Sequence, residues 1–374
     1  MTMSDPSSTR RLLSIDALRG FDMFWITGGS WLWCELCRLA GGRTASALSA
    51  QMGHVEWAGL HFIDFVFPVF VFVAGLSYPF SHAKQVARGD SRGTMVRKIL
   101  RRMFLLLVLG IVYNEFLASD WHKLADFRYF SVLGKIGIAW GVAAFVYMLT
   151  SLRVRLAVCF AGFAAYAALL FVVAPDAPAG ASPTSLEGCF VGYLDRLFTP
   201  GHLYCDNLLE PSGPFVSFFG YSTALLGMCG GDLVRSSRWT PARKSLLLAL
   251  CGFGCLAAGF ALSPVCPIVK KLWTPSFALT ASGAGFLAFA LFHQLIDVCG
   301  WTRWSFVFRL IGLNAIAIYF AGAFINFGAL AQFFTGGLAS LAGAGANLVV
   351  GLGAIGLRWL VLYFLYRHNI FFKV

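Results

Sequence analysis

A histidine and a carboxylate ten residues apart are the strongest chemical signal in this chain. His54 comes just before a long apolar segment, and Asp64 lies inside that segment, in the run from His54 to Pro68. An imidazole can take up and return a proton near neutral pH, which suits a general base. A carboxylate in an apolar segment is costly and is usually kept for function. We therefore predict His54 and Asp64 as catalytic residues. The alternative for His54 is an ordinary loop histidine at a membrane edge.

The composition indicates which kind of structure must position these residues. Of 374 residues, 58% are hydrophobic and only 12% are charged, about half the charged fraction of a soluble protein. A helix needs about 20 apolar residues to cross a bilayer. We therefore expect one all-α membrane domain, residues 1–374, with about ten transmembrane helices. The predicted spans are residues 14–34, 60–82, 98–117, 132–150, 155–174, 214–234, 245–263, 275–298, 306–326 and 347–366.

The net charge of +12 is explained by topology better than by a nucleic-acid partner. If the tail of residues 1–12 is cytoplasmic, 19 of the 29 basic residues lie on the cytoplasmic side and seven on the opposite side. This bias follows the positive-inside rule and predicts that both termini are cytoplasmic. The loop of His54 and the long segment 174–213 then lie outside, in the periplasm of a bacterium. We expect a multi-pass protein of the bacterial inner membrane, with 174–213 forming an ordered cap.

The ten cysteines show no spacing typical of a metal site, and we expect no metal. Cys189 and Cys205 lie in the same long outer segment. In a periplasmic loop they are equally compatible with a disulfide and with two free thiols.

Short motifs in order along nearly the whole chain resemble one enzyme family. They lie at residues 14–26, 54–68, 132–137, 223–227, 271–276 and 312–315. Together they resemble the heparan-α-glucosaminide N-acetyltransferase family and its bacterial relatives. The resemblance implies a membrane enzyme that takes acetyl-coenzyme A (acetyl-CoA) from the cytoplasm and acetylates an amino sugar on the far side. The family's active-site histidine matches His54. The chain has Ser212 where the family has a glutamate, and Lys135 where an arginine is usual.

The resemblance also suggests where the two substrates bind. Acetyl-CoA carries several phosphates, which Arg and Lys side chains hold by charge-assisted hydrogen bonds. For many basic residues the alternative is that they only set the topology. The predicted acetyl-CoA-binding residues are Arg19, Arg101, Arg102, Lys135, Trp273 and Arg358. The predicted residues for the amino-sugar acceptor are Asp22, Glu56, Trp57, Glu210 and Asn314.

Several polar residues in apolar segments have two readings. Asp16, Arg19 and Asp22 are spaced by three and share one helix face, either as a salt-bridge network or as the lining of a tunnel. On a continuous helix Asp64 would lie about 15 Å from His54, so we expect it to pair with Arg19 or Lys135 instead. Asn314 would bond either a neighbouring helix or a substrate carbonyl.

Three functions remain open on the sequence alone. The first is an acetyltransferase with His54 as general base, acting by direct transfer; an acetyl-histidine intermediate is the alternative. The second is an amino-sugar transporter, since transporters also bury charges. The third is an acyltransferase for a cell-envelope glycan. The expected partners are acetyl-CoA, a sugar acceptor and the lipid bilayer, with no nucleic acid; a homodimer is left open.

Overall fold

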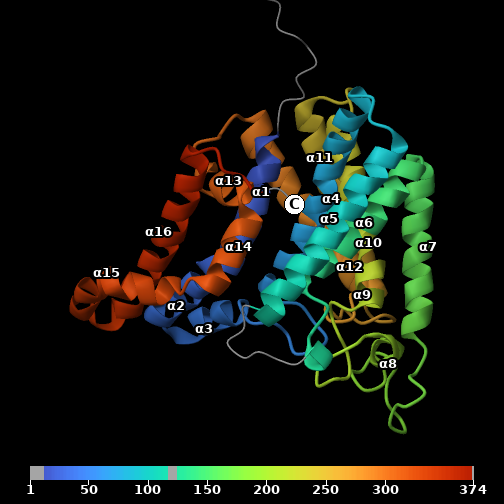
Figure 1. The fold of residues 1–374 in the computed structure, drawn as a ribbon, viewed down its shortest axis with the longest axis horizontal. Coiled ribbons are helices and arrows are strands. Elements are labelled where there is room, and N and C mark those ends of the chain that lie inside the picture. Colours follow the sequence, from blue (N-terminus) through green and yellow to red (C-terminus); the bar gives the residue numbers. More distant parts are fainter. Residues whose placement is uncertain (1–11, 117–123, 373–374) are drawn as a thin grey trace, which may run out of the picture.

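The chain folds as helices, as the apolar segments predict (Figure 1). The structure is a computed structural model that describes residues 12–116 and 124–372. Within these ranges there is no β-strand, only isolated bridges between loops. The prediction of an all-α membrane protein is confirmed. Most of the predicted cytoplasmic tail, residues 1–12, lies outside the described residues, as do Lys123 and Lys373.

The helices are named in chain order, with π and 3-10 turns labelled η. Their bounds are α1 Leu13–Phe24, η1 Trp25–Gly29, α2 Ser30–Ala40, α3 Gly42–Ala50, α4 Phe62–Ala87, α5 Arg92–Ile111, η2 Val112–Phe116, η3 Leu124–Asp126, α6 Val132–Leu149, α7 Leu152–Leu170, α8 Phe190–Phe198, α9 Pro214–Phe219, α10 Tyr221–Arg235, α11 Pro241–Leu262, α12 Pro275–Phe292, η4 His293–Val298, α13 Phe306–Leu313, α14 Ala315–Phe324, α15 Phe327–Leu341, η5 Gly343–Gly345 and α16 Ala346–Arg367.

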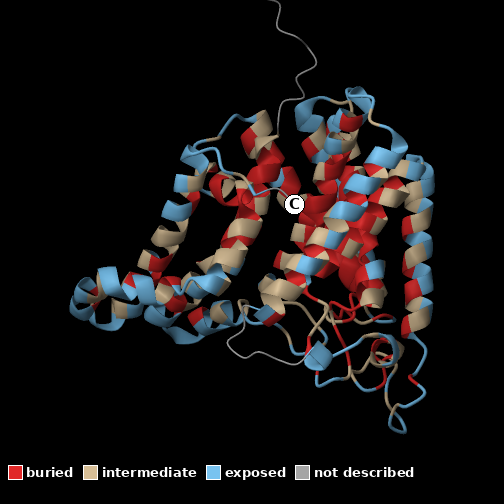
Figure 2. Cartoon of the chain, viewed as in Figure 1, coloured by how far each residue is buried: buried red, intermediate tan, exposed pale blue. Residues whose placement is uncertain are grey.

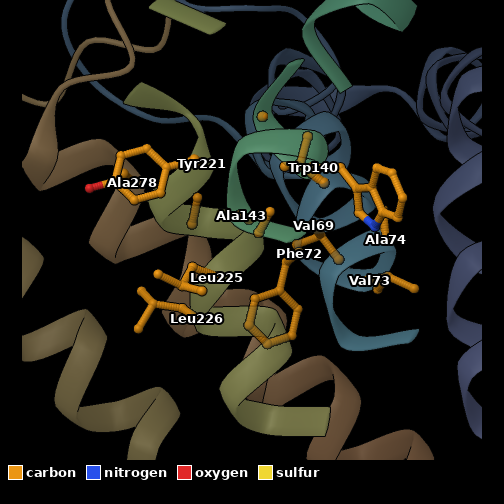
Figure 3. Close-up of a cluster of buried hydrophobic side chains, with 14 of the residues drawn as sticks. Val69, Phe72, Val73, Ala74, Trp140, Ala143, Tyr221, Leu225, Leu226 and Ala278 are labelled. Carbon is orange, nitrogen blue, oxygen red and sulfur yellow. The ribbon is translucent and has the colours of Figure 1, made fainter. Parts of the chain in front are cut away.

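The central bundle is built around α4, α6, α10 and α12, and it contains most of the buried side chains (Figure 2). Phe72 of α4 packs among Leu225 and Leu226 of α10 in this core (Figure 3). Helices α4 and α10 cross very closely, because a Cβ atom on Gly75 would lie 2.0 Å from the carbonyl oxygen of Ala224. Small residues at such crossings let helix backbones approach each other in membranes.

Helices α13 to α16 form a second group beside the bundle, together with α2 and α3 (Figure 1). Its smaller core includes Leu310, Ile318 and Phe327. Helix α1 joins the two groups by packing on α13, α4 and α12. The approach of α1 to α13 is close, since a Cβ on Gly312 would lie 2.0 Å from the carbonyl oxygen of Asp16.

Six helices in the described ranges are long and apolar enough to cross a membrane, or seven if the bent pair α13–α14 counts as one span. The axes of α13 and α14 meet at an angle of 74°, and Asn314 lies at the break between them. Three further predicted spans are helical but interrupted or polar. Residues 14–34 break at η1, where Gly28 has a φ of +145°, and residues 214–234 are divided at Gly220. Helix α5 carries four basic residues between Arg97 and Arg102.

The segment 174–213 forms an ordered cap at the His54 end of the bundle. It contains α8, and its loops are tied by isolated bridges between Val173 and Cys189 and between Cys205 and Leu209. The indole N–H of Trp57 donates to the carbonyl oxygen of Thr184 at 2.7 Å, which joins the cap to the His54 loop. The predicted cap is therefore present, and it borders the candidate site.

Candidate active site

The site begins where α4 begins. His61 is extended, with φ −112° and ψ 165°, and the helix starts at Phe62. Asp64, in the first turn, accepts a hydrogen bond from the backbone N–H of His61 at 3.0 Å. A carboxylate in the first turn satisfies free N–H groups and interacts favourably with the helix dipole. The start of the helix thus fixes Asp64 in one orientation.

His54 lies directly over this carboxylate. Its Nδ1 atom is 2.7 Å from Oδ1 of Asp64. The side chain of Asp64 is 1% exposed, whereas that of His54 is 61% exposed. An ionised carboxylate only accepts hydrogen bonds, so Nδ1 of His54 carries the proton and donates it to Asp64. In a neutral imidazole with its proton on Nδ1, the other nitrogen, Nε2, carries the lone pair and can act as a base.

Lys270 completes the cluster. Its Nζ atom lies 3.0 Å from Oδ1 of Asp64 and 3.0 Å from Nδ1 of His54. Because Nδ1 already donates to Asp64, the lysine donates to the carboxylate and not to the ring. Burial lowers the pKa of Lys270, and the nearby charge of Asp64 acts in the opposite direction. Asp64 therefore lies between two donors, which balance its buried charge.

An isolated bridge between two loops places Lys270. Ala58 pairs with Val269, and the N–H of Gly59 donates to the carbonyl oxygen of Ile268 at 3.0 Å. Gly59 has a φ of +121°, a conformation that side chains disfavour, so the glycine is needed at this turn. The bridge carries the loop before α12 against the His54 loop, although the two are more than 200 residues apart in sequence.

The expected partners of Asp64 were wrong. It pairs with His54 and Lys270, not with Arg19 or Lys135. The expectation assumed that residues 54–64 form one helix. The helix begins only at Phe62, and the loop before it folds back so that His54 comes over the first turn.

Two predicted acetyl-CoA residues, Lys135 and Trp273, lie near this end of the bundle. The Nζ atom of Lys135 is 4.0 Å from the ring centre of Trp273 and donates to the carbonyl oxygen of Pro211 at 2.7 Å. Trp273 is buried, and its indole N–H donates to Thr223. Lys135 thus holds the inner edge of the cap.

Glu210, a predicted acceptor residue, belongs to the cap itself and is completely buried. Its carboxylate pairs with Arg128, with contacts of 2.6 and 2.7 Å, and accepts the backbone N–H groups of Tyr204 and Ser212. The other predicted acceptor residues beside His54 are nearer the surface: Glu56 is exposed, and Trp57 is half-buried.

A cavity of about 310 Å³ lies further along α4, and we call it the Arg19–Arg102 cavity. Its lining includes Arg19, Arg102, Phe70 and Ser77. The Nε atom of Arg102 is buried with no hydrogen-bond partner among the described residues, and its guanidinium lies 4.1 Å from the ring centre of Trp140. Such a buried donor indicates a site for an anion.

The polar face of α1 borders this cavity. Arg19 lies 3.6 Å from Asp16, so part of the predicted salt-bridge network is present. Since Arg19 also lines the cavity, the two readings of this helix face are compatible. Asp22 is buried, and its Oδ2 atom has no hydrogen-bond partner in the described part of the chain.

The other predicted site residues lie elsewhere. Arg101 is exposed on the outer surface of α5, beside Arg97. Arg358 lines a separate cavity in the second group of helices. The amide of Asn314 donates to the carbonyl oxygen of Ile370 and accepts from the N–H of Phe372, both at 3.0 Å. Of the two readings of Asn314, the structure shows a bond within the protein.

The cysteines are free thiols, so of the two alternatives left open for Cys189 and Cys205 the structure shows the free thiols. Burial raises the pKa of both thiols, which makes them poor nucleophiles. Over residues 12–116 and 124–372, no group of three or more His, Cys, Asp or Glu side chains is placed to hold a metal ion.

The chain is similar to heparan-α-glucosaminide N-acetyltransferase. It is 25% identical to the Homo sapiens protein of that name over 97% of its own length, and 24% identical to the Mus musculus protein over 98%. It spans about 60% of the length of these relatives. No protein-family model matches the chain. The resemblance predicted from the motifs is confirmed.

Two features of the site were not predicted from the sequence. Lys270 was not among the predicted site residues, although it directly precedes the matched motif at residues 271–276. That position was the available signal. The residues Phe371 and Phe372, which line the Arg19–Arg102 cavity, gave no signal, because only folding brings them to α1 and α5.

Proposed function

We propose that this protein is a membrane acetyltransferase that moves an acetyl group from acetyl-CoA to the amine of an amino sugar, with His54 as general base. The observation that supports it is the His54 geometry. Nδ1 is held by a buried carboxylate, and the ring that carries Nε2 is exposed. The similarity to two N-acetyltransferases of glucosaminides supports the same reaction.

The reaction proceeds by direct transfer. Nε2 of His54 removes a proton from the amine, and the amine nitrogen forms a bond to the carbonyl carbon of the acetyl group. The carbon–sulfur bond then breaks, and the thiolate of CoA leaves with the proton that the imidazolium returns. Asp64 stabilises the imidazolium while it carries this proton. Lys270 keeps the buried Asp64 charge compensated when the imidazole is neutral.

The Arg19–Arg102 cavity fits part of acetyl-CoA. Arg19 and Arg102 suit phosphate oxygens, and the unpartnered Nε of Arg102 provides a donor for them. The apolar walls at Phe70 and Leu106 suit the uncharged arm that carries the thioester. Helix α4 connects the two parts, since Phe70 lies six residues, or about 9 Å along the axis, beyond Asp64. We propose that the thioester reaches His54 along this helix, with the acceptor bound beneath the cap.

The proposed orientation of the protein in the membrane follows from the charge bias of its loops. His54 and the cap face the periplasm of a bacterial inner membrane, and acetyl-CoA enters from the cytoplasm. Glu56 and Trp57, at the exposed side of the site, are proposed to contact the amino sugar. Lys135 and Glu210 are proposed to hold the cap in place over it.

The test uses purified protein in lipid nanodiscs, mixed with acetyl-CoA and glucosamine. We expect N-acetylglucosamine and free CoA thiol in equal amounts. His54→Gln, which keeps a polar side chain but provides no base, should lower kcat by about 10²- to 10⁴-fold. His202→Gln is the matched control, because His202 lies on the cap surface. An unchanged rate in His54→Gln would exclude the proposed base, and acetate trapped on His54 by acetyl-CoA alone would exclude direct transfer.

The bent pair α13–α14 favours a second candidate, an amino-sugar transporter. Its two halves are bent by 74° at Asn314, and transporters often break helices near their substrate site. Liposomes containing the protein distinguish the two. Uptake of labelled glucosamine without acetyl-CoA supports transport, whereas acetylation without uptake supports the enzyme.

A further inference from the structure

A second cavity, of about 690 Å³, lies in the second group of helices, and we call it the Arg358 cavity. It is lined by residues of η1, α2, η2, α14, α15 and α16, and Arg358 is the charged residue of its lining. It shares no lining residue with the Arg19–Arg102 cavity. It therefore needs an explanation separate from the proposed active site.

Arg358 lies near the middle of a membrane-spanning helix. It is 12 residues from the start of α16, or about 18 Å along the axis, and nine residues from its end. Its guanidinium stays within the cavity, 4.9 Å from the ring centre of Phe327. In the described ranges it has no acidic or hydrogen-bonding partner. A cation at this depth is expected to have an anionic partner, and the protein supplies none there.

The backbone near Arg358 leaves room for a ligand. Gly28 has a φ of +145° within the π-turn η1, and a Cβ atom there would lie 3.4 Å from Nη1 of Arg358. Any larger side chain would crowd the guanidinium. Two amide side chains, Gln332 and Asn347, also line the cavity. A cation and two amides in one cavity are suited to the oxygens of a phosphate and its neighbouring ester groups.

An apolar cavity of about 510 Å³ adjoins this one. Ile318 lines both, and the apolar cavity has only apolar side chains in its lining, including Phe320, Phe324, Leu362 and Leu365. Such a lining offers no donor or positive charge to a small free anion, but it can bury a hydrocarbon chain. The two cavities thus have the polarity of a single amphiphile, with a charged end at Arg358 and an apolar end along α14 and α16.

We propose that the Arg358 cavity and the apolar cavity together bind one molecule of an anionic phospholipid. Its phosphate pairs with Arg358, Gln332 and Asn347 lie beside its headgroup, and one acyl chain occupies the apolar cavity. The charged end of this site is separate from the proposed acetyl-CoA site, because Arg358, Gln332 and Asn347 do not line the Arg19–Arg102 cavity. The apolar cavity borders that site through Ile316 and Phe372, which line both.

The test measures lipid retention by native mass spectrometry. The purified protein is incubated with equal amounts of phosphatidylglycerol and phosphatidylcholine that have identical acyl chains. We expect wild type to retain phosphatidylglycerol with at least about tenfold preference, and Arg358→Gln to lose that preference. Arg358→Lys should keep part of it. Arg309→Gln removes an arginine from α13 and should bind as wild type does.

A second variant separates a lipid from free phosphate. Ala321→Trp fills the apolar cavity and leaves Arg358 in place. It should lose phosphatidylglycerol while its affinity for inorganic phosphate stays that of wild type. Equal phosphatidylglycerol retention in Arg358→Gln, or no preference in wild type, would overturn the proposal. If Ala321→Trp still retains phosphatidylglycerol, and inorganic phosphate displaces that lipid, the site binds a free anion and the proposal is wrong. Thermal unfolding of each variant verifies its fold, and Ala321→Trp tests the site even if Arg358→Gln fails to fold.

Discussion

At the scale of single residues, the tautomer of one imidazole carries the proposed chemistry. Asp64 fixes the proton on Nδ1 of His54 because it is buried, held by the N–H of His61 and balanced by Lys270. Three neighbours thus determine which ring nitrogen can act as a base. The same logic makes Asp64 a positioning residue, since it touches His54 and not the substrate.

Asp64→Asn tests this positioning. An amide can donate to Nδ1, so the ring can take the other tautomer, with its proton on Nε2. We expect kcat to fall by about 10²- to 10⁴-fold while the KM for the amino sugar changes little. Asp176→Asn is the matched control, because Asp176 is an exposed carboxylate paired with Arg196. If kcat falls equally in both variants, Asp64 does not set the tautomer.

A second carboxylate, Asp195 in the cap, makes stability depend on pH. It is fully buried, and burial raises its pKa to about 7, although the N–H of Glu210 and the nearby Arg196 act in the opposite direction. A carboxyl whose pKa is raised on folding favours the fold when protonated, and that contribution is lost as pH rises through about 7. The full effect is on the order of 4 kcal/mol.

We therefore expect the unfolding temperature of wild type to fall between about pH 4 and pH 7, and to change little through Asp195 above that range. Asp195→Asn cannot ionise, so its unfolding temperature should fall less over this range. Thermal unfolding in detergent, followed at several pH values, measures the difference. Parallel curves for the two proteins would show that Asp195 does not titrate as the fold predicts.

At the level of the helices, Asn314 at the break between α13 and α14 anchors the segment that follows α16. Its amide bonds the backbone of residues 370 and 372, and this segment places Phe371 and Phe372 in the lining of the Arg19–Arg102 cavity. The bend of the helix pair thus serves to hold the segment that follows α16.

Asn314→Ala should release this segment. The variant loses two hydrogen bonds, which costs about 1 to 3 kcal/mol of stability. Because the two phenylalanines occupy part of the cavity wall, their release should lower the KM for acetyl-CoA and leave kcat nearly unchanged. A chain that ends at Asn369 should behave in the same way. A higher KM in both variants would instead make the segment part of the binding surface.

At the scale of the whole molecule, the two ends of the central bundle have different chemistry. One end carries His54, Asp64 and Lys270 beside the cap, and the Arg19–Arg102 cavity lies further along α4. Such an arrangement suits a reaction whose two substrates come from opposite sides of a membrane. It requires the His54 end to lie outside, as the loop charges predict.

Single cysteines test this orientation. In intact cells, a maleimide that cannot cross membranes should label Glu56→Cys but should label Arg88→Cys only after the cells are permeabilised. Wild type gives the background from its own exposed cysteines, Cys251 and Cys299. The opposite pattern would reverse the topology and, with it, the side from which acetyl-CoA enters.

The helical membrane fold could be predicted from the sequence, because length and hydropathy are local properties of each segment. His54 and Asp64 could be proposed as site residues in the same way, since motif residues are recognised without coordinates. Their contacts could not be predicted, because they depend on how distant segments fold together. Lys270 reaches Asp64 through a bridge between two distant loops, and Arg358 separates from Arg19 and Arg102 because their helices belong to different groups. Contacts between distant segments depend on how the loops fold and the helices pack, which the periodicity of one segment does not contain.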